Sequence, residues 1–306
     1  MYKTYHKNHK KMKYSIITIN YNNRDGLKNT IESITNQSFN DYEYIIIDGG
    51  STDGSVDVIK EYQRISYWIS EKDNGIYNAM NKGVKVSHGE YLLFINSGDM
   101  LYNMNVLENT LPYLKADIVH GIAENISSPV SPLCLVKISN RKEPFSPTLH
   151  HQACLFRRKL FNNSFYDEKY KIVSDWKFYI EQIMIHNCSF IFIPIKVALC
   201  EGGGISETQN LLGINERIDV VNEIMDFLKE RKKFNVNKEL LLHIMFTSKQ
   251  RLIIDKETRN IDRYISTFPE SNNCYKQYPF TKKQKLLFFL AKHHMVYLLK
   301  ILLSIL

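Results

Sequence analysis

The stretch Tyr44-Ile45-Ile46-Ile47-Asp48 decides the fold, because an uninterrupted apolar run ends there in a carboxylate. A second stretch, Tyr91-Leu92-Leu93-Phe94-Ile95-Asn96, has the same form and leads into Ser97-Gly98-Asp99. Near-continuous apolar runs are typical of strands that are buried on both faces of a parallel sheet. The carboxyl ends of such strands form the ligand crevice of the sheet. We therefore expect Asp48 and Asp99 to lie at a binding site.

Strand and helix patterns alternate around these two stretches, which predicts an α/β fold with a mainly parallel sheet flanked by helices. The pattern predicts strands at 14–20, 42–48, 66–70, 91–96 and 118–121, and helices at 25–35, 55–62, 76–86 and 104–114. The helix predicted at 55–62 has Thr52 or Asp53 as a candidate cap.

The second half of the chain has a weaker pattern. Four prolines between 125 and 148 indicate loop or edge structure. Beyond them we expect strands at 152–156 and 190–194, a helix at 174–186 with Ser174 as its cap, and a glycine-rich loop at 200–206. Helical patterns follow at 211–232, 238–254 and 284–306. The predicted parts are a basic arm at 1–13, an α/β domain at 14–206 and a helical C-terminal extension at 207–306.

The net charge of +8 is unevenly distributed over the 306 residues. Residues 1–13 contain five lysines and no acid, residues 14–205 contain 18 basic and 21 acidic residues, and residues 206–306 contain 17 and 11. A nucleic-acid enzyme would carry positive charge across its site, so we expect no nucleic-acid partner. Basic ends suit attachment to an anionic membrane surface. For the N-terminal arm, the alternative is a lysine-rich segment that is simply solvated.

The sequence predicts a cytoplasmic protein that is peripheral on the inner face of the cell membrane. The five cysteines have no CxxC pair and no regular spacing, which favours buried thiols in a reducing compartment over a disulfide framework or a zinc site. No secretory signal and no clean membrane span are evident. The most apolar segment, 284–306, is interrupted by Lys292, His293, His294 and Lys300, which favours a helix lying in the membrane interface. The alternative is a helix docked on the protein's own core.

The turn after the first predicted strand excludes two nucleotide-binding classes. It reads Asn20-Tyr21-Asn22-Asn23-Arg24-Asp25-Gly26, and it contains neither GxGxxG nor GxxxxGK[ST]. This turn is therefore not expected to cradle a phosphate. Its polar side chains and Tyr21 suit a flat base.

Three further segments carry candidate binding groups. Asp48 leads into Gly49-Gly50-Ser51-Thr52-Asp53-Gly54, whose glycines allow close approach of a ligand, although an ordinary turn is the alternative. Asp73-Asn74-Gly75 opens a helix on which Asn78 and Asn81 share one face, although a polar surface turn is the alternative. Asn96-Ser97-Gly98-Asp99 ends in a carboxylate that suits Mg²⁺ or Mn²⁺, which bind one or two carboxylates and substrate phosphates.

The order and spacing of these segments resemble glycosyltransferase family 2, whose members have the GT-A fold. The resemblance rests on 14–21, 48–54, 74–83 (Asn-x-Gly-x-x-x-Ala-x-Asn-x-Gly) and 91–99, and it extends to about residue 206. The chain is most similar to the bacterial branch that builds O-antigen or capsule repeats. Two positions depart from the family pattern: Ser97 replaces the first aspartate of DxD, and Met80 replaces a frequent arginine.

The resemblance implies a donor site for a nucleotide-sugar. Asp99 is implied as the ligand of Mg²⁺ or Mn²⁺, although Ser97 makes metal dependence less secure. The residues implied in donor binding are Thr18, Asn20, Tyr21, Asp48, Ser51, Asp73, Asn74, Gly75, Asn78, Asn81, Ser97 and Gly98.

The second half is implied to supply the acceptor side and the catalytic base. Asp175 precedes an aromatic residue at a predicted helix start and resembles the base of this branch, with a helix-capping acid as the alternative. His151, Gln152 and Trp176 are candidate contacts to acceptor or phosphate, and a core histidine is the alternative for His151. The stretch 202–206 resembles a loop that closes over the donor, with a plain linker as the alternative.

These residues predict an inverting transferase that moves a sugar from a nucleotide-sugar, expected to be a UDP-sugar, to a hydroxyl of a glycan or lipid-linked saccharide. In this reaction Asp175 takes the acceptor proton and a nucleoside diphosphate leaves. One alternative is a non-catalytic nucleotide-sugar-binding or scaffold protein, which Ser97 favours. Another is a nucleotidyltransferase, which the first turn disfavours.

Overall fold

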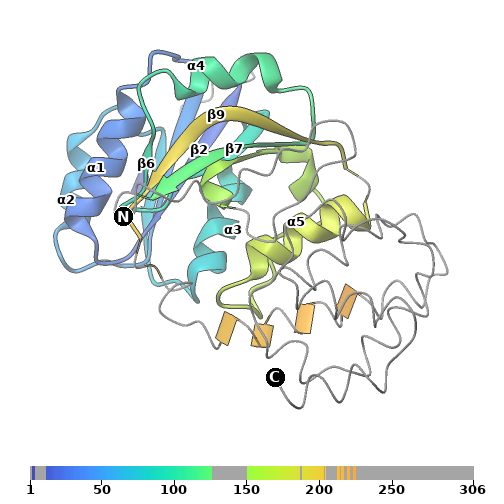
Figure 1. Ribbon diagram of the computed structural model, residues 1–306. Coiled ribbons are helices and arrows are strands. Elements are labelled where there is room, and N and C mark those ends of the chain that lie inside the picture. Colours follow the sequence, from blue (N-terminus) through green and yellow to red (C-terminus); the bar gives the residue numbers. More distant parts are fainter. Residues whose placement is uncertain are drawn as a thin grey trace, which may run out of the picture. The chain divides into compact units, whose positions relative to one another are not determined.

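The computed structural model describes residues 2–3, 12–125, 150–186, 188–202 and 204, together with eight residues between 212 and 224. Contacts within the chain separate it into two units, Met1–Leu135 with Leu149–Thr208, and Val136–Thr148 with Gln209–Leu306. All described strands belong to the first unit (Figure 1). The eight residues 212–213, 215–216, 219–220 and 223–224 have helical backbone, within the helix predicted at 211–232.

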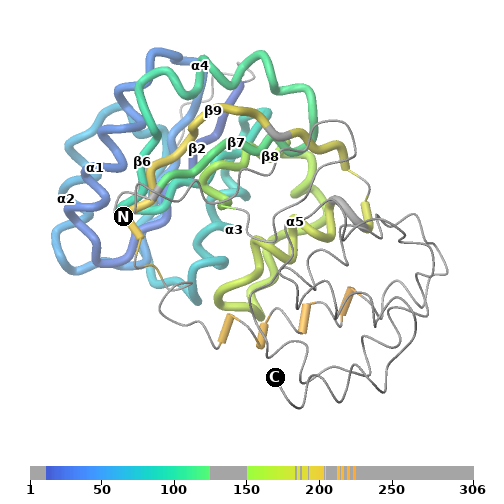
Figure 2. The backbone as a smooth tube through the Cα atoms, in the orientation of Figure 1, coloured from blue at the N-terminus to red at the C-terminus, as the bar shows by residue number. Residues whose placement is uncertain are grey.

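The first unit is built on a sheet with the strand order β1-β4-β3-β2-β5-β8-β7-β9-β6. The four strands β4, β3, β2 and β5 are parallel to one another, whereas β8 runs antiparallel between β5 and β7. Figure 2 shows β7, β8 and β9 side by side, and β7 and β9 are parallel. The strands are β1 (Tyr2–Lys3), β2 (Tyr14–Asn20), β3 (Tyr42–Asp48), β4 (Tyr67–Ser70), β5 (Tyr91–Phe94), β6 (Met100–Leu101), β7 (Ile118–Asn125), β8 (Cys154–Arg157) and β9 (Phe190–Cys200).

The chain reverses its direction of travel across the sheet beside β2. It adds β3 and β4 on one side of β2 and then returns to add β5 on the other side. Such a reversal is the topological switch point at which open α/β sheets bind ligands. The helices are α1 (Arg24–Thr35), α2 (Ser55–Glu61), α3 (Ile76–Val86), α4 (Val106–Thr110) and α5 (Ser174–Met184), with 3-10 turns η1 (Leu111–Tyr113), η2 (His151–Ala153) and η3 (Arg158–Phe161).

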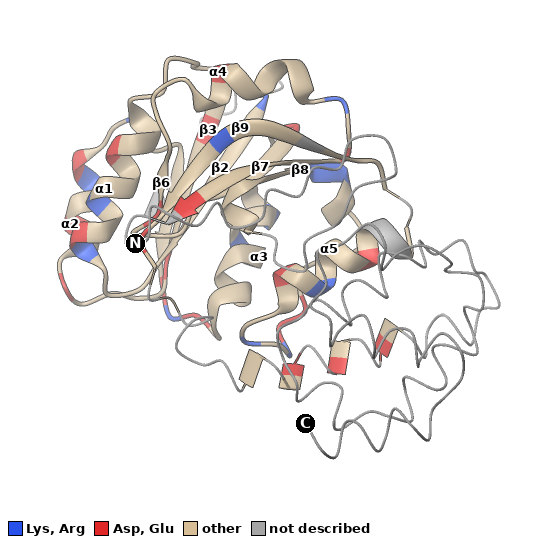
Figure 3. Ribbon diagram, viewed as in Figure 1, with Lys and Arg blue, Asp and Glu red and all other residues tan. Residues whose placement is uncertain are grey.

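Helices cover both faces of the parallel strands, which is why β3 is buried along its whole length. On one face, Ile16 and Ile46 pack in a cluster with Leu27, Ile31 and Ile34 of α1. The other face carries α3 and an aromatic cluster in which Phe94 of β5 and Phe156 of β8 contact each other. Figure 1 shows α1 and α2 on one side of the sheet and α3 on the other. The charges of α1 and α2 are of both signs (Figure 3).

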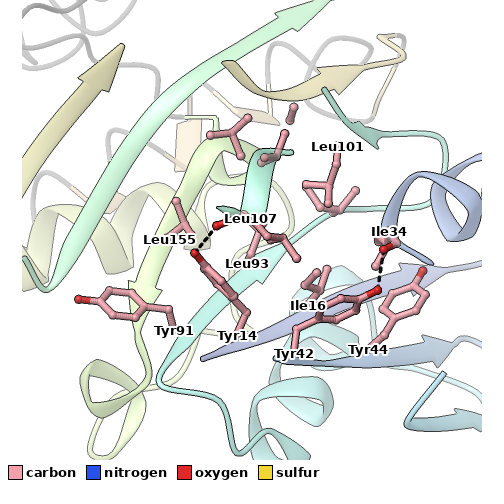
Figure 4. Packing of buried hydrophobic residues seen from close by; sticks show 14 of the residues in the cluster. Tyr14, Ile16, Ile34, Tyr42, Tyr44, Tyr91, Leu93, Leu101, Leu107 and Leu155 are labelled. Atoms are coloured by element: carbon pink, nitrogen blue, oxygen red, sulfur yellow. Dashed lines mark hydrogen bonds between the residues drawn. The ribbon is translucent and has the colours of Figure 1, made fainter. Parts of the chain in front are cut away.

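Three tyrosines form a row at the amino end of the parallel strands. Tyr14, Tyr42 and Tyr91 are the first residues of β2, β3 and β5, and they are in register across the sheet. Their buried hydroxyls donate to the carbonyls of Leu107, Ile34 and Ala116, each at 2.7 Å (Figure 4 shows the first two). A buried hydroxyl needs a partner, so the row ties strand starts to the segments packed above them.

Most predicted elements of the first unit are confirmed, including the α/β class, the strands at 14–20 and 42–48 and the helix at 76–86. The helix predicted at 104–114 was wrong in length, because Pro112 tightens the chain into η1 after the five residues of α4. Ser174 is the first helical residue of α5 and Val173 is the cap, so the predicted cap was wrong by one position. The cap of α2 is Gly54, while Asp53 accepts from the Ser55 N–H at 3.0 Å.

Several predictions lie outside the described residues. These include most of the arm at 1–13, the loop at 126–149 and the helices at 238–254 and 284–306. Within the part of the chain that the structure describes, no helix is long and apolar enough to cross a membrane. Cys154 is a buried free thiol, as the cysteine pattern predicted, whereas Cys188 and Cys200 are only partly buried.

We predict that Gly83→Ala destabilises the fold, because a Cβ at Gly83 would stand 2.5 Å from Cγ2 of Ile17 and would push α3 away from β2. Overpacking of this kind costs about 1–3 kcal/mol. The better helix propensity of alanine offsets about 1 kcal/mol. The free energy of unfolding in urea should therefore fall by up to about 2 kcal/mol. Lys28→Ala on the exposed face of α1 is the matched control, and a raised stability for Gly83→Ala would contradict the packing argument.

Candidate active site

A row of polar residues stands at the carboxyl end of the parallel strands, opposite the tyrosines. Asn20, Asp48 and Ser70 are in register on β2, β3 and β4. The Asp48 carboxylate is fully buried and accepts from Asn20 Nδ2 (2.7 Å), Ser51 Oγ (2.6 Å), Ser51 N (2.9 Å) and Ser70 Oγ (2.6 Å). Four donors compensate the burial of this charge, so Asp48 holds the two adjoining turns in one arrangement.

The turn after β2 is docked on the turn after β3. The Asn22 N–H donates to Ser51 Oγ at 2.8 Å, and the Asn22 side chain accepts from the Thr52 N–H at 2.8 Å. Asn22 has a φ of 49°, a left-handed conformation that asparagine tolerates better than most residues. The docking leaves Tyr21 on the surface with 67% of the residue exposed. An exposed aromatic ring at a ligand crevice is suited to stack on a flat base.

Asp73 stands beside this turn. Gly49 lies between them, because a Cβ on Gly49 would stand 3.2 Å from both Asp73 Oδ2 and Tyr21 Cδ2. Lys82 of α3 binds Asp73 at 2.5 Å and Glu71 at 2.7 Å. Burial raises the pKa of the Asp73 carboxyl, and the ammonium of Lys82 opposes that rise. Asp73 therefore lies next to Gly49 and Tyr21, and its contact with a donor stays a prediction.

The loop Ser97-Gly98-Asp99 follows β5 on the other side of β2. The Ser97 N–H donates to the Ile19 carbonyl at 3.1 Å, which brings the loop beside the end of β2. Asp99 is 8% exposed, and its carboxylate accepts from Gln152 Nε2 (2.8 Å) and the Glu201 N–H (3.1 Å). Burial raises the pKa of the Asp99 carboxyl. Gly98 has a φ of 99°, and the Glu201 carboxylate occupies the space where a Cβ would stand.

These residues fit a divalent cation only in combination with a substrate. Among the described residues there is no group of three or more His, Cys, Asp or Glu side chains that could hold a metal ion. Asp99 has the carboxylate that Mg²⁺ or Mn²⁺ prefers, and Ser97 contributes no second one. Mg²⁺ keeps most of its other positions for water and substrate phosphates. Asp99 thus fits an ion that arrives with a diphosphate.

The Asp175 carboxylate is held by three donors at the start of α5. His151 Nδ1 lies 2.8 Å from Oδ2, while the Tyr77 hydroxyl and the Trp176 N–H lie 2.8 and 2.9 Å from Oδ1. Burial alone would raise the pKa of Asp175, but His151 and then Tyr77 outweigh it and hold the pKa below the ordinary value. Asp175 is thus ionised at neutral pH, and 15% of its side chain is exposed. An ionised, partly exposed carboxylate can serve as a base.

Asn78 and Asn81 of α3, which the sequence predicted to bind the nucleotide-sugar, form hydrogen bonds with other protein groups. Asn81 is buried, and its amide donates to the Tyr166 carbonyl (2.8 Å) and to Glu168 (2.9 Å) while accepting from the Tyr166 N–H (3.0 Å). Asn78 Nδ2 donates to Glu168 at 2.9 Å. The asparagine pair therefore attaches the segment before α5 to α3, and direct contact of Asn78 or Asn81 with a donor stays a prediction.

The remaining predicted residues are placed as follows. Thr18 is fully buried inside β2, where its hydroxyl bonds to Tyr44, so the structure does not bring it to the edge of the sheet. Asn74 and Gly75 are exposed at the start of α3. Trp176 is buried, and no described group accepts from its indole N–H. Gly202 and Gly204 follow β9 and Glu201, although the rest of the predicted closing loop lies outside the described residues.

Sequence reasoning missed four residues that hold the site together. Tyr77 and Lys82 lie within the motif at 74–83, and Asn96 lies next to Ser97, yet only their contacts reveal their roles. Glu201 follows a strand far along the chain, and nothing in its neighbourhood in the sequence points to Asp99. The motif could have nominated Tyr77 and Lys82, whereas Glu201 had no sequence signal.

Comparisons with known proteins agree with this architecture. The profile described as Glycosyl transferase family 2 matches residues 15–165. A PGL/p-HBAD biosynthesis glycosyltransferase of Mycobacterium bovis is 29% identical over 206 residues, which cover 64% of this chain and 79% of that protein. An uncharacterized glycosyltransferase of Mycobacterium tuberculosis is 30% identical over 202 residues, which cover 61% of this chain and 73% of that protein.

Solved structures share the fold at low sequence identity. S. aureus TarS 1–349 in complex with UDP-GlcNAc has a TM-score of 0.66 and 15% identity, covering 94% of this chain and 90% of that one. The mannosyltransferase PcManGT of Pyrobaculum calidifontis, in complex with GDP-Man and Mn²⁺, has a TM-score of 0.60 and 11% identity, covering 97% and 85%. The family match and the curated relatives together show that the chain belongs to glycosyl transferase family 2 and is a glycosyltransferase.

Proposed function

We propose that this chain is an inverting glycosyltransferase that transfers a sugar from a UDP-sugar to a hydroxyl of a glycan or lipid-linked saccharide during assembly of a bacterial surface polysaccharide. The observation that carries the proposal is that two adjacent residues, His151 and Gln152, bond to two separate carboxylates. Gln152 donates to Asp99, and His151 holds Asp175 in its ionised form. The complex of TarS with UDP-GlcNAc supports a UDP-sugar, and the name of the mycobacterial relative, a PGL/p-HBAD biosynthesis glycosyltransferase, supports a role in biosynthesis of a glycosylated product.

The proposed reaction is a single displacement at the anomeric carbon. Asp175 accepts the proton of the attacking hydroxyl as that oxygen bonds to the anomeric carbon, while the bond to the nucleoside diphosphate breaks. Attack from the face opposite the leaving group inverts the configuration. The low pKa of Asp175 keeps the base ionised, and its three hydrogen bonds keep it in one orientation, so orientation contributes to the rate.

The donor side positions the nucleotide-sugar. Tyr21 stacks on the base, and Asp73 accepts hydrogen bonds from the nucleoside beside the turn that Asp48 holds in place. A divalent cation bound at Asp99 would neutralise charge on the diphosphate leaving group. Contacts far from the reacting carbon then orient that carbon toward Asp175.

A protein of the same fold that binds the donor without transfer is the second candidate, and Ser97 is the observation that favours it. A serine hydroxyl is a poorer ligand for Mg²⁺ or Mn²⁺ than a carboxylate. Binding of a UDP-sugar without turnover, with any acceptor and either cation, would establish this candidate. Release of pyrophosphate from an NTP and a sugar phosphate would instead establish a nucleotidyltransferase.

Asp175→Asn should retain donor binding and lose transfer, because the amide keeps the shape of the side chain but cannot accept the proton. The expected loss in kcat is about 10²- to 10⁴-fold. Donor binding is measured by thermal shift with UDP-sugars and Mn²⁺, since a bound ligand raises the unfolding temperature. Asp57→Asn on α2 is the matched control, because Asp57 is exposed and pairs only with Lys60 among the interactions described. Normal turnover by Asp175→Asn would remove Asp175 from the role of base.

Asp99→Asn should weaken activation by Mn²⁺, because the amide oxygen carries no charge to attract the cation. The Mn²⁺ concentration at half-maximal rate should rise by about tenfold or more, with Asp57→Asn again as the control. The measurement is a titration of metal-free enzyme at saturating donor. A wild-type rate that is insensitive to chelation would sink the proposed metal role while leaving the transferase proposal intact.

We further propose that the protein works as a peripheral protein on the inner face of the cell membrane, where a lipid-linked acceptor is available. The support is the basic charge of both ends and the apolar segment at 284–306. Removal of 284–306 should shift the protein from the membrane fraction to the soluble fraction. An unchanged distribution, in cells that express the full chain at the same level, would contradict this proposal.

A further inference from the structure

One short turn contacts both carboxylates of the site. His151 and Gln152 are neighbours in η2, and their side chains diverge. His151 Nδ1 lies 2.8 Å from Asp175 Oδ2, and Gln152 Nε2 donates to Asp99 Oδ2 at 2.8 Å. The proposed base and the proposed metal carboxylate are therefore bonded to adjacent residues of the chain. Asp99 and Asp175 are otherwise separated by 76 positions in the sequence.

The second nitrogen of His151 extends this link to the loop after β5. His151 Nε2 lies 3.1 Å from Asn96 Nδ2, and Asn96 begins the loop that ends in Asp99. Because ionised Asp175 can only accept, Nδ1 carries the proton and donates to it. Nε2 is then an acceptor for the Asn96 amide. This tautomer satisfies every partner of the ring.

The turn itself is anchored in the sheet. η2 leads directly into β8, which pairs with β5 on one side and β7 on the other. Ala153 is fully buried, and its N–H donates to the His150 carbonyl at 2.9 Å. Because β8 is antiparallel to β5, its start lies at the carboxyl end of β5. The two side chains of η2 are thus presented from a rigid strand, not from a free loop.

We propose that His151 and Gln152 are positioning residues that hold the base carboxylate of Asp175 and the metal-loop carboxylate of Asp99 at a fixed separation. This inference rests on the proposed function. It replaces the expectation from the sequence that these two residues contact acceptor or phosphate. His151 orients the base, and Gln152 orients the carboxylate that meets the cation. Their fixed spacing sets the distance between the attacking hydroxyl and the leaving diphosphate.

Among the groups around His151 and Asp175, His151 has the largest effect in lowering the pKa of Asp175. Asp175 is also faced by Tyr77 of α3, by Tyr166 and by Cys154 of β8, while Asp99 and His150 lie near His151. Burial raises the pKa values of Tyr77, Tyr166 and Cys154, so all three are neutral at physiological pH. Tyr77 also contacts the Ile172 carbonyl at 2.6 Å, so its single proton is divided between two acceptors.

Two substitutions of His151 separate its two bonds. Asparagine places an amide nitrogen as many bonds from Cβ as Nδ1, so His151→Asn keeps the donor to Asp175 and removes the link to Asn96. Glutamine can place its amide oxygen as far out as Nε2, so His151→Gln keeps an acceptor for the Asn96 amide and removes the donor to Asp175. We expect His151→Gln to lower kcat about 100-fold or more with little change in the KM for donor, whereas His151→Asn stays within about tenfold of wild type.

The pH profile gives a readout that mere destabilisation would not move. Loss of the His151 donor raises the pKa of Asp175, so protonation inactivates the base at a higher pH. The acid limb of the kcat/KM profile should therefore shift upward by on the order of one pH unit in His151→Gln. It should shift less in His151→Asn. The matched control is His186→Ala, because His186 is an exposed histidine beyond the end of α5.

Gln152→Ala tests the other half of the pair. It should raise the Mn²⁺ concentration at half-maximal rate by about 10- to 100-fold, the usual effect of removing a partner of a metal ligand, without moving the acid limb. Gln37→Ala is the matched control, because Gln37 is also a hydrogen-bonded glutamine but lies on the α1 side, against Asn103 and Leu107.

The outcomes separate this inference from the proposed function. If wild-type protein transfers no sugar from any donor, the proposed function fails. The positioning role is tested only in variants that unfold at the wild-type temperature. It is overturned if wild type transfers sugar and these variants have the same acid limb of the kcat/KM profile and the same Mn²⁺ concentration at half-maximal rate as the controls. If both His151 variants lose activity because the KM for acceptor rises, His151 contacts the acceptor instead. Normal unfolding temperatures with the split effects described above support the proposal.

Discussion

The site depends on the in-register alignment of the parallel strands β2, β3, β4 and β5. Because residues at equal height on neighbouring strands share one edge, Asn20, Asp48 and Ser70 meet, and the tyrosines at the opposite end tie down the strand starts. A slip of one residue in β3 would turn Asp48 to the other face of the sheet. Burial of apolar side chains on both faces prevents such a slip, so the core itself determines where the binding groups stand.

Buried charge is the second constraint, and each carboxylate meets it differently. Asp48 is surrounded by neutral donors and has no exposed surface, which makes it a structural centre for the two turns. Asp73 is paired with Lys82, and Asp99 is bonded to Gln152 and the Glu201 N–H. Asp175 keeps a small exposed fraction among three donors. The carboxylates with some access to solvent are those assigned to ligand, metal or proton.

Much of the donor half could be predicted because its signals are local. Apolar runs, their terminal carboxylates and the helix at 76–86 were all readable from neighbouring residues, and Gly83 is explained by the close approach of α3 to Ile17. The length of the helix at 104–114 was less predictable, because Pro112 outweighed the periodicity. The contacts of Asn81 with Tyr166 and of Glu201 with Asp99 join residues 85 and 102 positions apart, and no local pattern encodes them.

By itself, the sequence determined the α/β class, the strand end that carries Asp48, the loop after β5 that carries Asp99, and the candidate base at the start of α5. Side-chain periodicity and turn composition are properties of short segments, which is why these features were readable. Only the tertiary structure decided which partner each side chain has. It buried Thr18, turned Asn81 toward Tyr166 and joined His151 and Gln152 to two different carboxylates. The physical reason is that β8 enters the sheet beside β5 from a distant part of the chain, and strand pairing of that kind is set by the whole core.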